Sequence, residues 1–154
     1  MRMRTLAGAA AALALAIVPL TTVSASAATL EVDYGKPSDG SLYFCDAKVG
    51  NTYVLSCFSD DGDSIYTADW EADGKRVATQ WKLSDGSRTG LCISTKGPSY
   101  LPTQGWVGTR MQCDKNMVEG KKILIRGGTC DGDVSSCTKP SQYGQWTAWD
   151  SAEV

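Results

Sequence analysis

Polar turns and short alternating segments follow one another at a steady interval along residues 28–154. Asp-Gly or Gly-Asn pairs begin at positions 39, 50, 61, 73 and 85, which are 11, 11, 12 and 12 residues apart. These pairs favour hairpin turns because glycine and asparagine tolerate a positive φ. Strands are therefore expected between and beyond the turns, at Ser41–Asp46, Thr52–Phe58, Ser64–Glu71, Lys75–Leu83, Thr89–Ser94, Trp106–Cys113, Lys121–Arg126 and Gln145–Trp149.

Polar and apolar positions alternate most clearly in the segment Lys75–Leu83. One of its faces collects Val77, Thr79, Trp81 and Leu83. In the preceding strand, Trp70 is expected in the core, and Asp69 and Glu71 are expected to face solvent. Antiparallel sheets with one packed and one solvated face produce this alternation. The sequence thus predicts an all-β fold, an antiparallel β-sandwich of about eight strands built as a meander of Asp-Gly hairpins.

The first 27 residues have the features of an export signal. Arg2 and Arg4 form a basic start, Leu6–Leu20 is rich in alanine and leucine, and Ala25-Ser26-Ala27 places small residues before a cleavage point. The apolar run is shorter than the roughly 20 residues needed to span a bilayer. We expect cleavage after Ala27, which leaves 127 of the 154 residues as one secreted domain, 28–154.

The charge balance of residues 28–154 narrows the choice of partner. Without the two arginines of the signal, 13 basic residues stand against 17 acidic ones, a net charge of −4. An acidic chain of mixed charge is a poor ligand for nucleic acid or for an anionic membrane surface. No nucleic-acid partner is expected, and no membrane partner once the signal is removed.

Six cysteines in an exported chain predict three disulfides. Their spacing around turns and loops favours pairing of neighbours along the chain. The predicted pairs are Cys45 with Cys57, Cys92 with Cys113, and Cys130 with Cys137. The alternative, a zinc site, is disfavoured because the chain has no histidine and no Cys-x-x-Cys pair.

The absence of histidine also removes the most common catalytic base. Asp69, Glu71 and Glu119 could form a glycosidase pair, but their positions favour solvated surface charge. The acidic stretches 60–63 and 131–133 lack the pattern of a full calcium loop. We therefore expect a protein that is not an enzyme, with no catalytic residue, cofactor or metal ligand.

Two segments are candidates for binding another molecule. The first is the stiff loop 96–105, in which Pro98 and Pro102 flank Tyr100 and Leu101. A pre-organised loop of this kind could enter a protease cleft, or it could be an ordinary long connection.

The second candidate is the alternating segment that follows the predicted cleavage site. Its candidate binding residues are Thr29, Leu30, Val32 and Tyr34. The segment could pair as an edge strand or extend freely towards a partner. Trp106, Trp146 and Trp149 raise a third idea, sugar stacking, although Trp146 and Trp149 should point to opposite faces of a strand.

Several motifs within residues 66–137 carry a family resemblance: Trp70–Val77, Trp81, Gly86–Cys92 and Cys113–Gly120. With these motifs the chain resembles small exported, disulfide-rich β-domain proteins of filamentous actinobacteria, mostly of unassigned function. More weakly, it resembles the adaptor subunit of umbrella-shaped antibacterial toxin particles. In such particles a small β-domain links a repeat-bearing stalk to a lectin, which would make 28–34 the plug for a cleft of the lectin subunit.

The expected function is therefore that of a secreted, non-enzymatic protein-binding module, with an adaptor in an extracellular antibacterial toxin assembly as its most specific form. Its partner would be another secreted protein, such as a lectin-like or a stalk subunit. The alternatives are a secreted protease inhibitor that uses the 96–105 loop and a carbohydrate-binding module.

Overall fold

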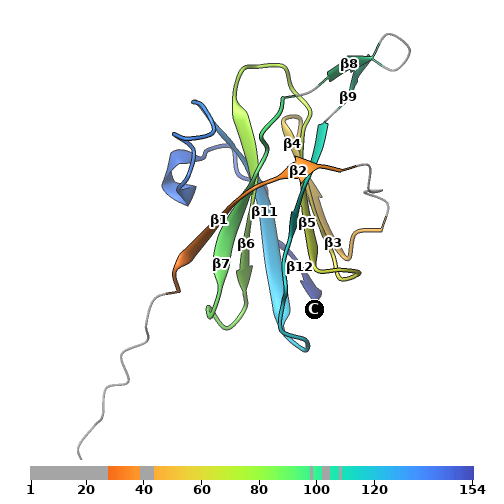
Figure 1. Ribbon diagram of the computed structural model, residues 1–154, viewed down its shortest axis with the longest axis vertical. Helices are drawn as coiled ribbons and strands as arrows, with labels where there is room; N and C mark the ends of the chain where they lie inside the picture. Colours follow the sequence, from red (N-terminus) through yellow and green to blue (C-terminus); the bar gives the residue numbers. More distant parts are fainter. Residues whose placement is uncertain (1–27, 39–43, 98, 102–104, 108) are drawn as a thin grey trace, which may run out of the picture.

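The computed structural model describes residues 28–38, 44–97, 99–101, 105–107 and 109–154, with only the backbone described for 99–101 and 105–107. Within these residues, twelve strands form two five-stranded sheets and one two-stranded hairpin (Figure 1). The prediction of an all-β sandwich is confirmed, with more strands than the eight expected. No helix in the described residues is long and apolar enough to cross a bilayer.

The first sheet, here called sheet A, has five strands in the order β1 (Leu30–Tyr34), β7 (Thr89–Ile93), β6 (Arg76–Leu83), β11 (Lys122–Cys130) and β12 (Asp150–Glu153). Sheet B has the order β2 (Lys36–Pro37), β10 (Thr109–Asp114), β5 (Ser64–Asp69), β4 (Val54–Ser59) and β3 (Ala47–Gly50). The hairpin consists of β8 (Ser99–Leu101) and β9 (Gly105–Val107). All neighbours pair antiparallel except β1 and β7, which are parallel.

Some of the predicted turns, but not all of them, form hairpins. The turns at 50–51, 61–62 and 85–86 join the antiparallel neighbours β3–β4, β4–β5 and β6–β7. The turn at 73–74, in contrast, carries the chain from β5 in sheet B to β6 in sheet A, so a continuous meander was a wrong prediction. A turn dipeptide sets the local reversal of the chain, but not the sheet in which the next strand pairs. The predicted turn at 39–40 lies outside the described residues.

Three strand predictions need correction. Residues 44–46 do not form a strand, and the first strand of that region is β3; residues 41–43 lie outside the described part. Within Trp106–Cys113 the structure has two strands, β9 and β10, in different sheets. Gln145–Trp149 is not a strand, and the last strand is β12. The C-terminal stretch before β12 instead contains a short 3-10 helix, Pro140–Gln142.

The core lies between the sheets, where β6 and β11 of sheet A face β4 and β5 of sheet B (Figure 1). The predicted inner row of β6 is confirmed: Val77, Thr79, Trp81 and Leu83 are all buried. In β5 the predicted faces are exchanged, because Ile65 packs inside while Ala68 packs on the outer face. Asp69 consequently points inwards and is 1% exposed, whereas Trp70 is 37% exposed.

The three predicted disulfides form, and each fixes a different part of the sandwich. Cys45–Cys57 holds the connection before β3 to the outer face of sheet B. Cys92–Cys113 joins β7 to β10 and so ties the two sheets together through the core. Cys130–Cys137 holds the 131–149 segment over the outer face of sheet A, where Tyr143 and Trp146 complete a second apolar cluster. Such disulfides are typical of an extracellular protein.

Candidate binding edge

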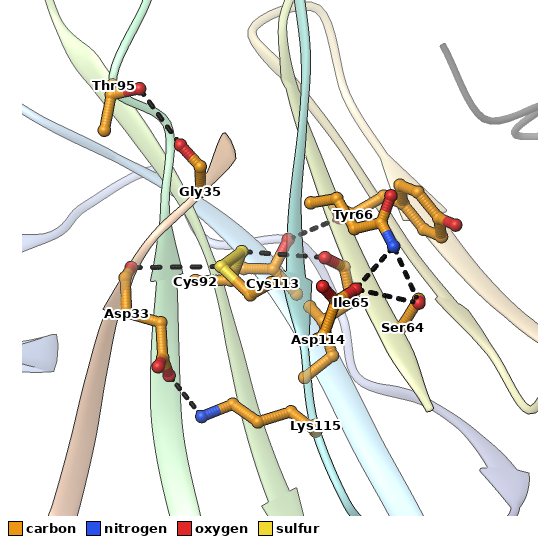
Figure 2. Close-up of a disulfide and its surroundings, with 12 residues drawn as sticks. Asp33, Gly35, Ser64, Ile65, Tyr66, Cys92, Thr95, Cys113, Asp114 and Lys115 are labelled. Carbon is orange, nitrogen blue, oxygen red and sulfur yellow. Dashed lines mark hydrogen bonds and ion pairs between the residues drawn. A yellow bond between two sulfur atoms is a disulfide. The ribbon is translucent and has the colours of Figure 1, made fainter. Parts of the chain in front are cut away.

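The N-terminal strand passes from one sheet to the other at Gly35. Before this residue, β1 pairs with β7 in sheet A, and after it, β2 pairs with β10 in sheet B. The Thr95 hydroxyl donates to the Gly35 carbonyl oxygen at 3.1 Å, beside the disulfide that joins the sheets (Figure 2). A Cβ on Gly35 would lie 2.6 Å from the Cβ of Met111, so this crossing requires glycine.

Two carboxylates of β1 face the gap between the sheets and meet two cations there. Arg88 donates to Glu31 at 2.7 and 3.0 Å, and Lys115 Nζ lies 3.0 Å from the same carboxylate. Lys115 also pairs with Asp33 (Figure 2). The Lys115 and Arg88 charges lie 5.0 and 5.4 Å from the ring centroid of the buried Trp81. In the structure, therefore, β1 is an edge strand held by ion pairs and not a free arm.

The charges of this cluster stabilise the packing of β1 against the rest of the sandwich. Hydrogen bonds from Arg88 and Lys115 lower the pKa of Glu31, against a smaller opposing effect of burial. The hydrogen bond to Glu31 raises the pKa of Arg88. A carboxylate with a lowered pKa contributes stability above its ordinary pKa and loses it only as the pH falls through the lowered value. The Glu31 carboxylate is thus ionised, and paired with Arg88 and Lys115, at neutral pH.

The other face of β1 carries the predicted binding row, Leu30, Val32 and Tyr34. Val32 packs on the apolar cluster beneath the 131–149 segment, while Tyr34 is 50% exposed. Thr29, just before the strand, is exposed. The structure thus leaves Thr29 and Tyr34 exposed and uses Val32 for packing.

The backbone of β1 also has an open side. The Gly35 N–H donates to Ile93 O at 2.9 Å, so the backbone N–H of Gly35 points towards β7. Backbone groups alternate in direction along a strand, so those of Leu30, Val32 and Tyr34 point away from β7. No described residue hydrogen-bonds to them. An unpaired row of this kind at a sheet edge can accept a further strand.

The predicted loop 96–105 covers β8 and the first residue of β9, and the hairpin of these two strands projects beyond one end of the sandwich (Figure 1). Tyr100 pairs with Trp106 and Leu101 with Gly105. The hairpin lies in the segment closed by the Cys92–Cys113 disulfide, as predicted. It stands apart from β1, so the two candidate segments form separate surfaces (Figure 1).

Trp146 and Trp149 lie on one side of sheet A and not on opposite faces. The Arg126 guanidinium lies 4.1 Å from the ring centroid of Trp146 and 4.6 Å from that of Trp149. Lys82 Nζ lies 4.6 Å from the Trp149 centroid. The expected strand is absent, so the alternation of strand side chains does not apply. Cations of the sheet already occupy faces of both rings, which leaves less ring surface for a sugar.

The candidate acid residues have very different surroundings. Glu71 and Glu119 are exposed, as expected. Asp69 is buried; its Oδ1 accepts a hydrogen bond from the Glu71 N–H at 3.2 Å, and its Oδ2 has no hydrogen-bond partner. Burial raises the pKa of Asp69 to about 6. No group of three or more acidic, histidine or cysteine side chains suited to a metal occurs among the described residues.

Sequence reasoning missed both the ion cluster and the burial of Asp69. Arg88 and Lys115 lie 57 and 84 residues from Glu31, so no local pattern links them. The alternation of acidic and apolar residues in 30–34 was the available signal that one face of this strand would meet cations. For Asp69, the apolar Ile65 four residues earlier on the same face was the corresponding signal.

Comparisons with models of protein families, with curated proteins and with solved structures gave no significant match. The family resemblance of the sequence motifs therefore stays a prediction.

Proposed function

We propose that this protein is a secreted, non-enzymatic binding module that receives a protein partner along β1. The observation that carries the proposal is the open backbone of Leu30, Val32 and Tyr34. A partner strand could pair with these groups, while the exposed Tyr34 side chain adds apolar contact area. The ion cluster supports the proposal because a strand already held in place loses little entropy on binding.

In its most specific form, the proposal is an adaptor that links components of an extracellular antibacterial toxin assembly. The export signal, the disulfides and the sequence resemblance support this form. The plug version of the idea would require 28–34 to leave the sandwich and to break its ion pairs with Arg88 and Lys115. Addition of a partner strand to β1 leaves those pairs intact and is the mode we favour.

The test removes one backbone donor from the open edge. Leu30→Pro deletes an N–H that points away from β7, and proline is tolerated at the first residue of an edge strand. Leu30→Ala is the matched control, because it shortens the side chain and keeps the N–H. Tagged versions secreted by the native host would be purified from culture fluid, and co-purifying proteins identified by mass spectrometry.

We expect the wild type and Leu30→Ala to retain the same partners and Leu30→Pro to lose at least one of them. An adaptor should retain two different partners in one complex, which native mass spectrometry would detect. A wild-type protein that elutes alone at monomer size would count heavily against any partner. Equal retention by Leu30→Pro would exclude strand addition at this edge.

A protease inhibitor is the second candidate, favoured by the projecting β8–β9 hairpin. Its test is slow cleavage next to Tyr100 or Leu101 by a bound serine protease. Failure to protect any serine protease from attacking its substrate would remove this candidate.

A further inference from the structure

Two neighbouring strands in the interior of sheet A carry only positive charges. The charged residues of β6 and β11 are Arg76, Lys82, Lys122 and Arg126, and neither strand contains an acidic residue. All four alternate with the buried row of their strand, so they lie on the outer face of the sheet. This positive face contrasts with the acidic balance of residues 28–154.

Arg126 is held in one position by its neighbours. Its Nε donates to Gln80 Oε1 at 2.8 Å, and its guanidinium lies 4.1 and 4.6 Å from the ring centroids of Trp146 and Trp149. No acceptor among the described residues reaches the N–H groups of its two terminal nitrogens. Aromatic rings stack on the faces of a guanidinium, and a carboxylate binds along its edge through two parallel hydrogen bonds. The described part of the chain therefore leaves this hydrogen-bonding edge of Arg126 unused.

Lys82 supplies a second cation at the same place. It lies on β6, next to the strand that carries Arg126, and its Nζ is 4.6 Å from the ring centroid of Trp149. Lys82, Arg126 and Trp149 are all partly exposed, so a ligand can approach them from solvent. Both cations thus surround one ring on an accessible face of the sheet.

Neither cation forms an ion pair with a described carboxylate. Asp150 accepts a hydrogen bond from the backbone N–H of Lys48 in sheet B. Glu153 lies opposite Lys122, four residues along β11 from Arg126. Burial is the only cause that shifts the pKa of Arg126, and it lowers this pKa, as expected for a cation without a neighbouring carboxylate.

The segment that carries both tryptophans is fixed before any ligand arrives. Gln145 has a φ of 49°, which is uncommon for a residue other than glycine. Its side-chain Oε1 accepts from the Thr129 hydroxyl at 2.7 Å, and its backbone oxygen accepts from Asn51 Nδ2 at 3.0 Å. Trp146 follows directly and packs on Gly128. Backbone strain of this kind is concentrated at functional sites, and a pre-arranged site loses less entropy on binding.

We propose that Arg126 and Lys82 bind an acidic segment of a partner protein, with one carboxylate on the guanidinium of Arg126 and a second on Lys82. A sugar would stack on ring faces that these cations already occupy, so an acidic protein segment fits this surface better than an acidic polysaccharide. The inference specifies the chemistry of a partner and so rests on the proposed function of a protein-binding module. It does not depend on strand addition at β1, because the two cations lie on other strands.

The test uses the disulfide-bonded protein labelled with nitrogen-15 and titrated at low ionic strength with blocked tetraglutamate. Blocked tetraglutamine is the uncharged control of the same length. The indole N–H signals of Trp146 and Trp149 report binding, because both rings contact Arg126. Arg126→Gln and Lys82→Gln each remove one cation of the site. Lys48→Gln is the matched control, with the same change of net charge on a strand of sheet B.

We expect saturable shifts of the indole signals with tetraglutamate and not with tetraglutamine, and weaker binding when sodium chloride is added. Arg126→Gln should weaken binding at least about tenfold, because a charge-assisted pair of hydrogen bonds is lost. Lys82→Gln should weaken binding about two- to fivefold, and Lys48→Gln should bind as the wild type does. Lys82→Gln leaves the contacts of Arg126 with both rings in place, so it tests the site even if Arg126→Gln moves them.

Equal responses to the two peptides, or undiminished binding by both site variants, would overturn the proposal. Equal weakening by Lys48→Gln would do the same, because it would show attraction to net charge only. Tighter binding of tetragalacturonate than of tetraglutamate would assign the surface to acidic polysaccharides instead. Leu30→Pro should bind tetraglutamate as the wild type does; loss of the peptide by this variant would place it at β1 and also contradict the proposal.

Discussion

Replacing Asp69 by asparagine should make the stability of this protein less dependent on pH. Burial raises the pKa of the carboxyl from 3.8 to about 6 in the folded state. The hydrogen bond from the Glu71 N–H and the charge of Arg76 lower this pKa, and the charges of Asp73 and Glu71 raise it. The flanking strands place the uncharged Val54 and Thr109 opposite it. Ionisation therefore opposes folding at this position.

The magnitude follows from the difference between the two pKa values. Each pH unit corresponds to about 1.4 kcal/mol, so the ionised Asp69 costs the folded state about 3 kcal/mol above pH 7. A carboxyl with a raised pKa binds more protons in the folded state, so its cost fades as the pH falls towards 3.8. The cost is therefore about 2 kcal/mol larger at pH 8 than at pH 4.5.

Urea unfolding of the wild type and of Asp69→Asn at pH 4.5 and pH 8, with disulfides intact, measures this term. The amide leaves its own N–H groups without an acceptor, but that cost is the same at both pH values and cancels in the comparison. The free energy of unfolding of the variant, minus that of the wild type, should be about 2 kcal/mol larger at pH 8 than at pH 4.5. An unchanged difference between the two proteins would show that the carboxylate is paired or hydrated in solution.

Three further variants, one of them a double substitution, test other parts of the structure. Replacing Cys92 and Cys113 by alanine opens a link that spans 21 residues and should lower the free energy of unfolding by about 3 kcal/mol; an unchanged urea midpoint would contradict the role of this disulfide. Lys115→Met should cost about 1–2 kcal/mol and speed hydrogen exchange of the β1 amides, because it removes the cation that pairs with Asp33 and leaves Glu31 with Arg88 alone; unchanged exchange would mean that Lys115 does not help to hold the strand. Gly128→Ala puts a Cβ 2.5 Å from the Trp146 ring and should cost about 1–3 kcal/mol, with a shift in tryptophan fluorescence; an unaltered spectrum would show that the ring is not packed there.

Local patterns predicted several of the strands and turns and all three disulfides. The alternation in β6, the turns at 50, 61 and 85, and the pairing of neighbouring cysteines all appear in the structure. Each of these features depends on residues close together in sequence. A turn residue sets its own backbone angles, and a strand alternates because successive side chains point to opposite faces.

The faces and partners of the strands depended on distant contacts. Alternation in β5 defines two faces but does not say which of them another sheet will cover, so Asp69 and Trp70 were assigned the wrong surroundings. For the same reason, β1 could be proposed as an edge strand, whereas its parallel partner and its ion pairs with Arg88 and Lys115 could not.

The composition of this chain and the spacing of its turns and cysteines are sufficient to predict a disulfide-linked β-sandwich of the extracellular type. They also mark a candidate N-terminal strand. Packing between segments far apart in sequence created the open side of that strand and the unsatisfied oxygen of Asp69. Both features are backbone or side-chain groups left without a hydrogen-bond partner among the described residues. Whether a polar group is left without a partner depends on every residue that surrounds it in the folded molecule, and only three-dimensional packing sets those surroundings.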